Sequence, residues 1–176
     1  FDKWEPAIPA TMPAEDMIVK AIWTVNQYTI TFDTDGGNLI EAITQDYNSA
    51  IIRPANPVKE GYTFTKWSQP VPTTMPAENI TITALWTINQ YTISFDSDGG
   101  TAVDPITQNF NSAITAPVAP TKVGYTFSGW NPALPTIMPA EDMELVAIWA
   151  INSYQLIYTI DDVTSSKDIN FGETVT

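Results

Sequence analysis

The amino-acid sequence predicts a mainly β protein made of small units that are repeated in tandem. Two observations carry this prediction. Residues of the same type recur at a constant spacing of 63 positions, and short segments alternate apolar with polar side chains between Gly, Pro and Asp residues. A fixed period of this length indicates a repeat architecture, and a period of two within a segment indicates a half-buried strand.

The aromatic residues define the repeat. All six Trp and three of the seven Tyr fall into series of three members with a spacing of 63 positions: Trp4, Trp67 and Trp130; Trp23, Trp86 and Trp149; Tyr28, Tyr91 and Tyr154. Without a gap, residues 28–90 match residues 91–153 at 33 of 63 positions. We therefore divide the chain into the C-terminal half of a repeat (1–27), two complete repeats (28–90 and 91–153) and the N-terminal half of a diverged repeat (154–176).

The diverged half-repeat needs a turn of its own. It lacks the Gly-Gly pair that follows the first strand of the other copies, so its turn must differ. It regains an aromatic residue at Phe171, which corresponds to Phe110 at a spacing of 61 positions and not 63.

The first half of a complete repeat predicts strands and turns in alternation. Residues 28–32 alternate apolar residues with Thr and lead into Asp35-Gly36-Gly37, which indicates a strand followed by a turn with positive φ. We expect a second strand over 43–52, a turn over 56–61 and a third strand that starts at Tyr62. Trp67 has the opposite parity to Tyr62 and Phe64, so a bulge or bend must intervene if all three are buried.

The second half contains a proline-rich segment and the clearest strand. Prolines exclude a sheet interior over 69–77, and residues 76–78 fit one helical turn with Pro at its first position. The fourth strand places four apolar residues on one face in each copy: Ile80, Ile82, Ala84 and Trp86; Met17, Val19, Ala21 and Trp23; Met143, Leu145, Ala147 and Trp149.

The joint between the complete repeats is short. Residues 87–90 separate Trp86 from Tyr91 and include neither Gly nor Pro, whereas flexible linkers are typically longer and rich in Gly and Ser. We therefore expect a semi-rigid joint and an extended rod of repeats.

The composition argues against several classes of protein. Twenty acidic and seven basic residues give a formal net charge of −13, which disfavours nucleic acid as a partner. The absence of Cys and His removes thiol nucleophiles, the usual zinc and haem ligands and the commonest general base. No apolar run reaches the roughly 18 residues of a membrane span, and the start of the chain has no signal-peptide layout, so we expect an excised piece that does not insert into a membrane.

Three motifs together resemble the Listeria/Bacteroides repeat, also called the internalin B-repeat. They are Asp-Gly-Gly after an aromatic strand, Gly-Tyr-Thr-Phe-x-x-Trp at 61–67 and 124–130, and Met-Pro-Ala-Glu before a strand that ends in Trp. The resemblance covers essentially the whole chain. It implies a small β-grasp-like unit, a β-rich α+β fold, carried in tandem on bacterial cell-surface proteins as a stalk or adhesion-associated segment. The Pro-rich segment 69–76 would then replace the helix of a regular β-grasp.

We assign no catalytic, cofactor-binding or metal-binding residue. The segments 33–38 and 96–100 superficially resemble calcium loops, but an EF-hand loop would need Gly at position 38 and Glu at position 44, where the chain has Asn38 and Thr44. A structural turn is favoured over a weak cation site. We also expect folding to require no divalent metal.

Other candidate sites have a simpler structural interpretation. Glu15-Asp16 and Glu141-Asp142 could form a glycosidase acid pair, but adjacent strand residues face opposite ways, and a solvated turn is favoured. The recurrent Trp and Tyr residues could stack on sugars, but their fixed positions in apolar strands favour core packing. We expect Trp67, Trp86, Trp130 and Trp149 to be buried and not to line a groove. The glycosylation sequon at 79–81 carries no weight, and the recurrent Lys59 and Lys122 are expected to be ordinary exposed lysines and not isopeptide donors.

The sequence thus favours a non-enzymatic extracellular repeat segment that spaces other domains on a bacterial surface or cell wall, with weak adhesion of its own as an option. The alternative is a specific module that binds a glycan or a protein of a host or a neighbouring cell. An enzyme is the least favoured class. Neighbouring repeats of the same chain are the nearest expected partners, and no cofactor is expected.

Overall fold

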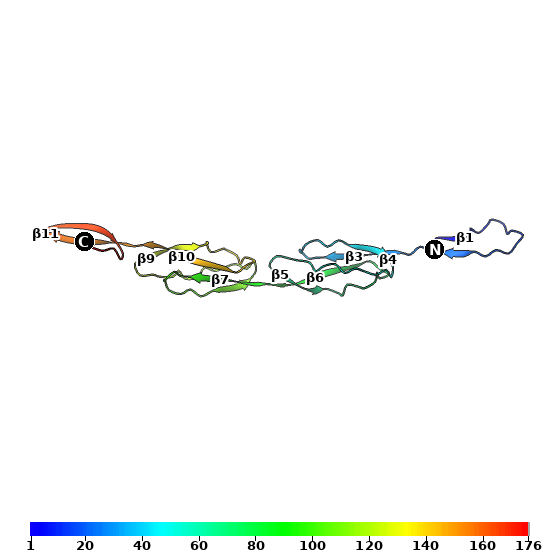
Figure 1. The fold of residues 1–176 in the computed structure, drawn as a ribbon, viewed down its shortest axis with the longest axis horizontal. Helices are drawn as coiled ribbons and strands as arrows, with labels where there is room; N and C mark the ends of the chain where they lie inside the picture. The colour runs from blue at the N-terminus through cyan, green and yellow to red at the C-terminus, as the bar shows by residue number, and fades with distance from the viewer. Residues whose placement is uncertain (176) are drawn as a thin grey trace. The chain divides into compact units, whose positions relative to one another are not determined.

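The computed structural model describes residues 1–175, and these residues form strands and no helix (Figure 1). The strands are β1 (Lys3–Glu5), β2 (Lys20–Ile22), β3 (Gln27–Asp33), β4 (Ile43–Asp46), β5 (Tyr62–Trp67), β6 (Ile80–Ile88), β7 (Gln90–Asp96), β8 (Ile106–Asn109), β9 (Tyr125–Asn131), β10 (Met143–Ile151), β11 (Ser153–Ile160) and β12 (Val163–Asn170). The mainly β fold is confirmed. The helical turn expected at 76–78 is wrong, because residues 77 and 78 form a bend.

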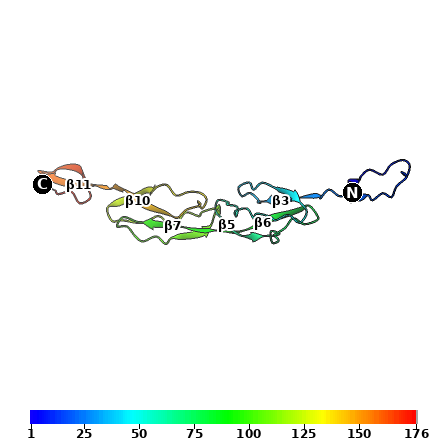
Figure 2. The ribbon, with the colours of Figure 1, turned by 45° about the vertical axis from the view of Figure 1, so that its right-hand side comes forward.

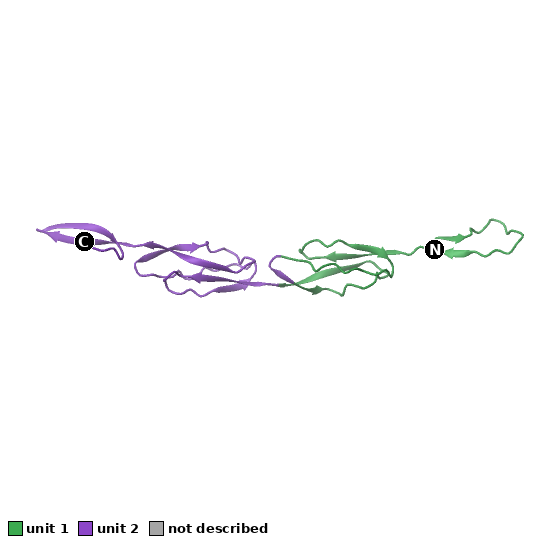
Figure 3. Cartoon of the chain, viewed as in Figure 1, with its two compact units in different colours: residues 1–59, 64–87 green, residues 60–63, 88–176 purple. Residues whose placement is uncertain are grey.

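The chain forms two compact units (Figure 3). Unit 1 contains residues 1–59 and 64–87, and unit 2 contains residues 60–63 and 88–176. The boundary between the units therefore differs from the boundary between the repeats, because the short segment 60–63 of the first complete repeat belongs to unit 2.

Each complete repeat forms one four-stranded sheet. In unit 2 the order is β8-β7-β10-β9, with β7 and β10 parallel and both outer pairs antiparallel. The two central strands stay side by side in both ribbon views (Figure 1, Figure 2). The first repeat has the same order, β4-β3-β6-β5, with β3 and β6 parallel. The first and last strands of each repeat therefore run in the same direction at the centre of the sheet.

One face of each sheet carries the core. In the first repeat the alternation expected for the fourth strand is confirmed, because Ile82 and Ala84 are buried and Ile80 and Trp86 half-buried. The opposite face is polar, and Thr29 and Thr44 pair across the strands with their hydroxyl oxygens 2.8 Å apart. An antiparallel edge with one apolar and one polar face is the usual result of such alternation.

The Pro-rich segment covers the core instead of forming an element of its own. Met75 is 1% exposed, its N–H donates to the carbonyl of Ser49 at 2.9 Å, and its carbonyl accepts from Asn48 at 2.9 Å. Met138 is fully buried in the second repeat with the same bonds to residues 111 and 112. Residues 48–51 thus make their backbone hydrogen bonds with the Pro-rich segment. The second strand is therefore shorter than expected and ends at Asp46 instead of Ile52.

The connection from one sheet edge to the other also differs from the expectation. The chain leaves β4 at one edge and reaches β5 at the other through residues 47–61, which contain no helix. The segment 69–76, which we expected in place of the β-grasp helix, instead joins β5 to its neighbour β6.

The bulge expected between Phe64 and Trp67 is seen at the equivalent place of the second repeat. Phe127 pairs with Trp149 and Gly129 with Ile148, so Ser128 is left without a partner in the ladder. The extra residue reverses the parity of the strand, which lets Phe127 and Trp130 contact each other with ring centroids 5.1 Å apart.

A single residue separates the last strand of the first repeat from the first strand of the second. Asn89 donates its backbone N–H to the carbonyl of Gly61 at 2.9 Å and accepts from the N–H of Phe110 at 2.9 Å, and its side chain accepts from Thr63 at 2.6 Å. All four residues belong to unit 2. Asn89 therefore makes hydrogen bonds with these three residues of its own unit.

An aromatic ring also packs against the joint between the two repeats. Phe110 lies against Gly61, where an added Cβ would overlap the ring, and makes an edge contact with Tyr62 at 6.1 Å between centroids. Phe171 lies in the same way against Gly124 and Tyr125, with centroids 6.0 Å apart. The predicted correspondence of Phe171 with Phe110 is confirmed.

The terminal half-repeats form hairpins. Residues 1–27 contain the short strands β1 and β2, so the fourth-strand pattern from Met17 to Trp23 yields a strand only at 20–22, and Trp23 is 70% exposed. In the C-terminal copy, β11 and β12 pair throughout their length around Asp161 and Asp162, which both have positive φ. This two-residue turn replaces the Gly-Gly turn, as the missing glycines predicted.

The core assignment predicts a large loss of stability for Ile82→Ala. Ile82 is fully buried in one cluster with Ile30 and Met75, and such a truncation costs about 2–5 kcal/mol. The matched control is Ile52→Ala, because Ile52 is 87% exposed, and its effect should stay within about 0.5 kcal/mol. Urea unfolding followed by Trp fluorescence measures both, and equal midpoints for the two variants would contradict the core.

Candidate functional site

The turn after the first strand is the most elaborate polar feature that the two complete repeats share. In the first repeat the N–H of Asp35 donates to the Asp33 carboxylate at 3.0 Å, and Thr34 Oγ1 donates to the carbonyl of Gly37 at 3.0 Å. Asp35 and Gly36 have φ values of 46° and 86°. The carboxylate that a cation would need is therefore already an acceptor within the turn.

A tryptophan from the fourth strand closes this turn. Trp86 Nε1 donates to the carbonyl of Thr34 at 3.1 Å, and its ring lies over Gly37. A Cβ at position 37 would lie 2.8 Å from Trp86 Cζ2 and 3.1 Å from the carbonyl oxygen of Val58. The second Gly of the Asp-Gly-Gly motif is thus needed for the close approach of the indole.

A lysine completes the turn, contrary to our expectation of an ordinary exposed side chain. Lys59 Nζ donates to the carbonyl of Asp35 at 2.6 Å, lies 3.6 Å from the Asp35 carboxylate and 5.6 Å from the centroid of the Trp86 ring. Only 22% of the Lys59 side chain is exposed. The lysine recurs because it binds the turn.

The second repeat has the same arrangement. Asp98 N–H donates to the Asp96 carboxylate at 2.8 Å, Lys122 Nζ to the carbonyl of Asp98 at 2.6 Å, and Trp149 Nε1 to the carbonyl of Ser97 at 3.0 Å. Over residues 1–175, no group of three or more Asp, Glu, His or Cys residues could hold a metal ion. The geometry favours the structural interpretation of both turns over the cation site.

The two carboxylates of the Glu141-Asp142 pair, disfavoured above as glycosidase acids, have different surroundings. Asp142 accepts a hydrogen bond from the backbone N–H of Thr92 at 2.7 Å, while Glu141 is exposed. Asn79, the first residue of the sequon, accepts in the same way from the N–H of Thr29 at 2.8 Å. Residues 79 and 142 therefore position the first strand of their repeats, a role that the sequence pattern did not reveal.

Of the four tryptophans expected to be buried, only Trp67 is, at 5% exposed. Trp86, Trp130 and Trp149 are half-buried, and their rings contact phenylalanine rings with centroids 4.8–5.7 Å apart. The prediction that none lines a groove is wrong for Trp67, which lies in the wall of a pocket.

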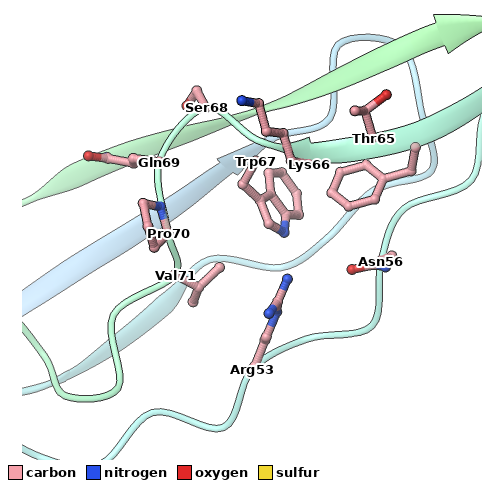
Figure 4. Close-up of a pocket in the computed structure, with 10 residues that line it drawn as sticks. Arg53, Asn56, Thr65, Lys66, Trp67, Ser68, Gln69, Pro70 and Val71 are labelled. Atoms are coloured by element: carbon pink, nitrogen blue, oxygen red, sulfur yellow. The ribbon is translucent and has the colours of Figure 1, made fainter.

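This pocket, which we call the Trp67 pocket, has a volume of about 450 Å³ and lies within unit 1 (Figure 4). Its wall combines two basic, four uncharged polar and four largely apolar residues: Arg53 and Lys66; Asn56, Thr65, Ser68 and Gln69; Phe64, Trp67, Pro70 and Val71. No carboxylate lines it, although the chain has twenty acidic residues. The volume is in the range of small-molecule sites.

The Trp67 indole carries an unsatisfied donor beside this pocket. Its Nε1 is buried and has no hydrogen-bond partner among the described residues. In Figure 4 the indole nitrogen faces the end of the Arg53 side chain, which is another donor. A buried polar atom left without a partner typically costs about 1–3 kcal/mol, so an acceptor placed here would be stabilising.

The closure of the turn predicts that Gly37→Ala destabilises the first repeat. The new Cβ would meet both the Trp86 ring and a backbone carbonyl that cannot move independently, and overpacking of this kind costs about 1–3 kcal/mol. Leu39→Ala, at a position 78% exposed, serves as the control. Urea unfolding of the two variants checks this, and a Gly37→Ala chain as stable as the control would argue against the packing of Trp86 on the turn.

We predict that removal of divalent cations leaves the melting temperature unchanged. The carboxylates of Asp33 and Asp96 already accept from backbone N–H groups, which leaves few convergent oxygens for a cation. Melting curves followed by circular dichroism, with and without a chelator, measure this. A fall of many degrees in the chelator would overturn the structural interpretation of the turns.

The described residues, 1–175, provide no helix that could cross a membrane. Relatives of the chain include two proteins of Evansella cellulosilytica. One, described as a Gly-rich membrane protein, is 34% identical over 173 residues, covering 89% of this chain and 20% of the relative. The other, described as a membrane protein, is 35% identical over 178 residues, covering 91% of this chain and 27% of the relative.

Internalin H of Listeria monocytogenes is 44% identical over 115 residues, which cover 60% of this chain and 20% of the relative. The chain thus spans about a fifth to a quarter of the length of these relatives. The family model of the Listeria-Bacteroides repeat domain matches residues 28–84 and again residues 91–148. The family model matches both complete repeats, and the motifs that these repeats share form the turn, the core and the joint described above. The chain therefore belongs to the Listeria-Bacteroides repeat family.

Proposed function

We propose that this chain is a non-enzymatic spacer segment of a bacterial surface protein, located outside the cell at its surface or in its wall. Its task is to hold other domains of the same protein apart at a set spacing. The membership of the repeat family and the relatives described as internalin and membrane proteins support this location.

The observation that carries the proposal is the parallel pairing of the first and last strands of each repeat. β3 and β6 run parallel from Ile30 opposite Ile80 to Asp33 opposite Thr83. The chain therefore enters a repeat at one end of its sheet and leaves at the other. Each repeat adds length to the chain instead of returning it to its starting point, which is the property that a spacer needs.

The joint supports the same role. Only Asn89 lies between β6 and β7, and its backbone and side chain are tied to Gly61, Thr63 and Phe110. By charge count, residues 28–90 carry six acidic and three basic side chains and residues 91–153 six and one, so the repeats repel each other at low salt. We propose on these grounds that consecutive repeats form an extended, semi-rigid array.

A non-enzymatic role agrees with the chemistry of the chain. The sequence has no Cys and no His, and the carboxylates that recur in the turns accept hydrogen bonds from the backbone. The second candidate function is a module that binds a glycan or a protein of another cell, with no nucleic acid among its partners. One observation favours it, namely the carboxylate-free Trp67 pocket.

Spin labels test the joint directly, because the absence of Cys lets two introduced cysteines be labelled selectively. We expect Ile52→Cys with Val118→Cys, at positions 87% and 90% exposed, to give a narrow distance distribution by electron–electron double resonance. Insertion of Gly-Ser-Gly-Ser after Asn89 should broaden it. The pair Ile52→Cys and Leu39→Cys, both within unit 1, is the fixed reference and should stay narrow in both chains.

A broad distribution in the chain without the insertion would contradict the semi-rigid joint. Small-angle scattering of the same chain tests the extension. A profile of one globule with the repeats packed side by side would overturn the spacer proposal and favour the binding module.

A further inference from the structure

The Trp67 pocket is lined by two basic residues and by no carboxylate. Arg53 and Lys66 are two of only seven basic residues in a chain with a net charge of −13, and the pocket wall contains no carboxylate. Across residues 1–175, the ion pairs of the structure involve Lys59 and Lys122, and no carboxylate pairs with Arg53. A positive site without a built-in counter-ion favours an anionic ligand.

The second observation is independent of charge. The Nε1–H of Trp67 belongs to a residue that is only 5% exposed, and no described residue accepts its hydrogen bond. Figure 4 shows this nitrogen turned toward the Arg53 side chain, so two donors face each other without an acceptor between them. Because the Arg53 side chain is exposed, it can move aside to admit an acceptor. A carboxylate accepts from two donors at once through its two oxygens.

The remaining polar residues indicate what surrounds that carboxylate. Asn56 at the pocket wall carries an amide that both donates and accepts hydrogen bonds. Thr65, Ser68 and Gln69 already bond to Thr87, Thr83 and Thr81, and each keeps further hydrogen-bonding capacity. Sugar hydroxyls need such partners, whereas a simple carboxylic acid offers nothing for them. The pocket volume of about 450 Å³ exceeds what a carboxylate alone would fill and suits a sugar ring.

We propose that the Trp67 pocket of the first repeat binds an acidic sugar, a hexuronate whose carboxylate accepts hydrogen bonds from Arg53 and from Trp67 Nε1. Asn56 binds a ring hydroxyl, and Lys66, whose amine is turned away from Arg53 in Figure 4, adds positive charge near the pocket. The proposal is independent of the spacer role, because a spacer segment need not carry any sugar site.

The second repeat provides a natural control. At the equivalent positions of that repeat, Ala116, Ala119, Gly129 and Pro132 stand in place of Arg53, Asn56, Lys66 and Gln69, while Trp130 is retained. The second repeat therefore lacks both basic residues and both amides of the pocket, although Ser128 and Asn131 keep polar side chains in place of Thr65 and Ser68. The site belongs to one repeat and is not a property of the fold.

The test is a titration of the complete, ¹⁵N-labelled chain with D-galacturonate, followed through the indole N–H signals of its six Trp residues. Single Trp→Phe variants assign these signals. We expect the Trp67 signal to shift progressively and the Trp130 signal to stay in place. D-galactose, which lacks the carboxylate, and acetate, which lacks the ring, should each bind at least about tenfold more weakly.

Two variants assign the contacts. Arg53→Gln should weaken galacturonate binding at least about tenfold, since it removes a charge-assisted hydrogen bond, whereas Ile52→Gln, at the exposed neighbouring position, should leave it unchanged. Arg53 is exposed, so its replacement should not unfold the repeat, and an unchanged spectrum of the other indoles verifies this.

The proposal is overturned if the Trp67 signal stays fixed at tens of millimolar galacturonate, or if Trp130 shifts equally. It is also overturned if galactose or acetate binds as well as galacturonate, or if Arg53→Gln binds like the parent. A short acidic peptide that binds where galacturonate does not would show a peptide site instead. None of these results bears on the spin-label distances, so the spacer proposal is judged separately.

Discussion

The parallel pair at the centre of each sheet is the constraint from which the rest of the repeat follows. Because β3 and β6 point in the same direction, no tight hairpin can join them, and the intervening chain must go to both edges of the sheet and back. The edge strands β4 and β8 have only four residues each, and the connections that lead to and from the sheet edges are irregular. These connections cover the apolar face, and Met75 and Met138 fill the core from them.

The parallel pair also determines where the recurrent Trp, Gly and Lys residues of the turn are needed. The turn after the first strand reverses the chain beside the last strand, so the indole of Trp86 or Trp149 lies directly over it. This close approach requires Gly37 and Gly100, and a lysine donates a hydrogen bond to a carbonyl of the turn. A motif that resembles a cation loop thus results from the packing of a tryptophan.

The sequence predicted what depends on local periodicity. The constant spacing of the two complete repeats, the fourth strand with its buried Ile82, the bulge near Trp130 and the altered turn of the last copy all appear in the structure. The predictions were wrong where tertiary contacts determine the local structure. The second strand stops at Asp46 because residues 48–51 pair with the segment around Met75, and the lysines are bound because a distant turn offers a carbonyl. The Trp67 pocket was not predicted because Arg53 and Trp67 lie in different segments of the sequence, and no periodic pattern links these segments.

The strand geometry also determines how a repeat responds when its two ends are pulled. Force enters at the start of β3 and leaves at the end of β6, and these strands are adjacent and parallel, so the pull runs along them and loads all hydrogen bonds between them at once. In the last hairpin, β11 and β12 are antiparallel, so the start of β11 and the end of β12 lie side by side. A pull on these two ends breaks the hydrogen bonds between the strands one after another. The sheet of a complete repeat is therefore built to resist tension in shear, whereas the β11–β12 hairpin opens by unzipping.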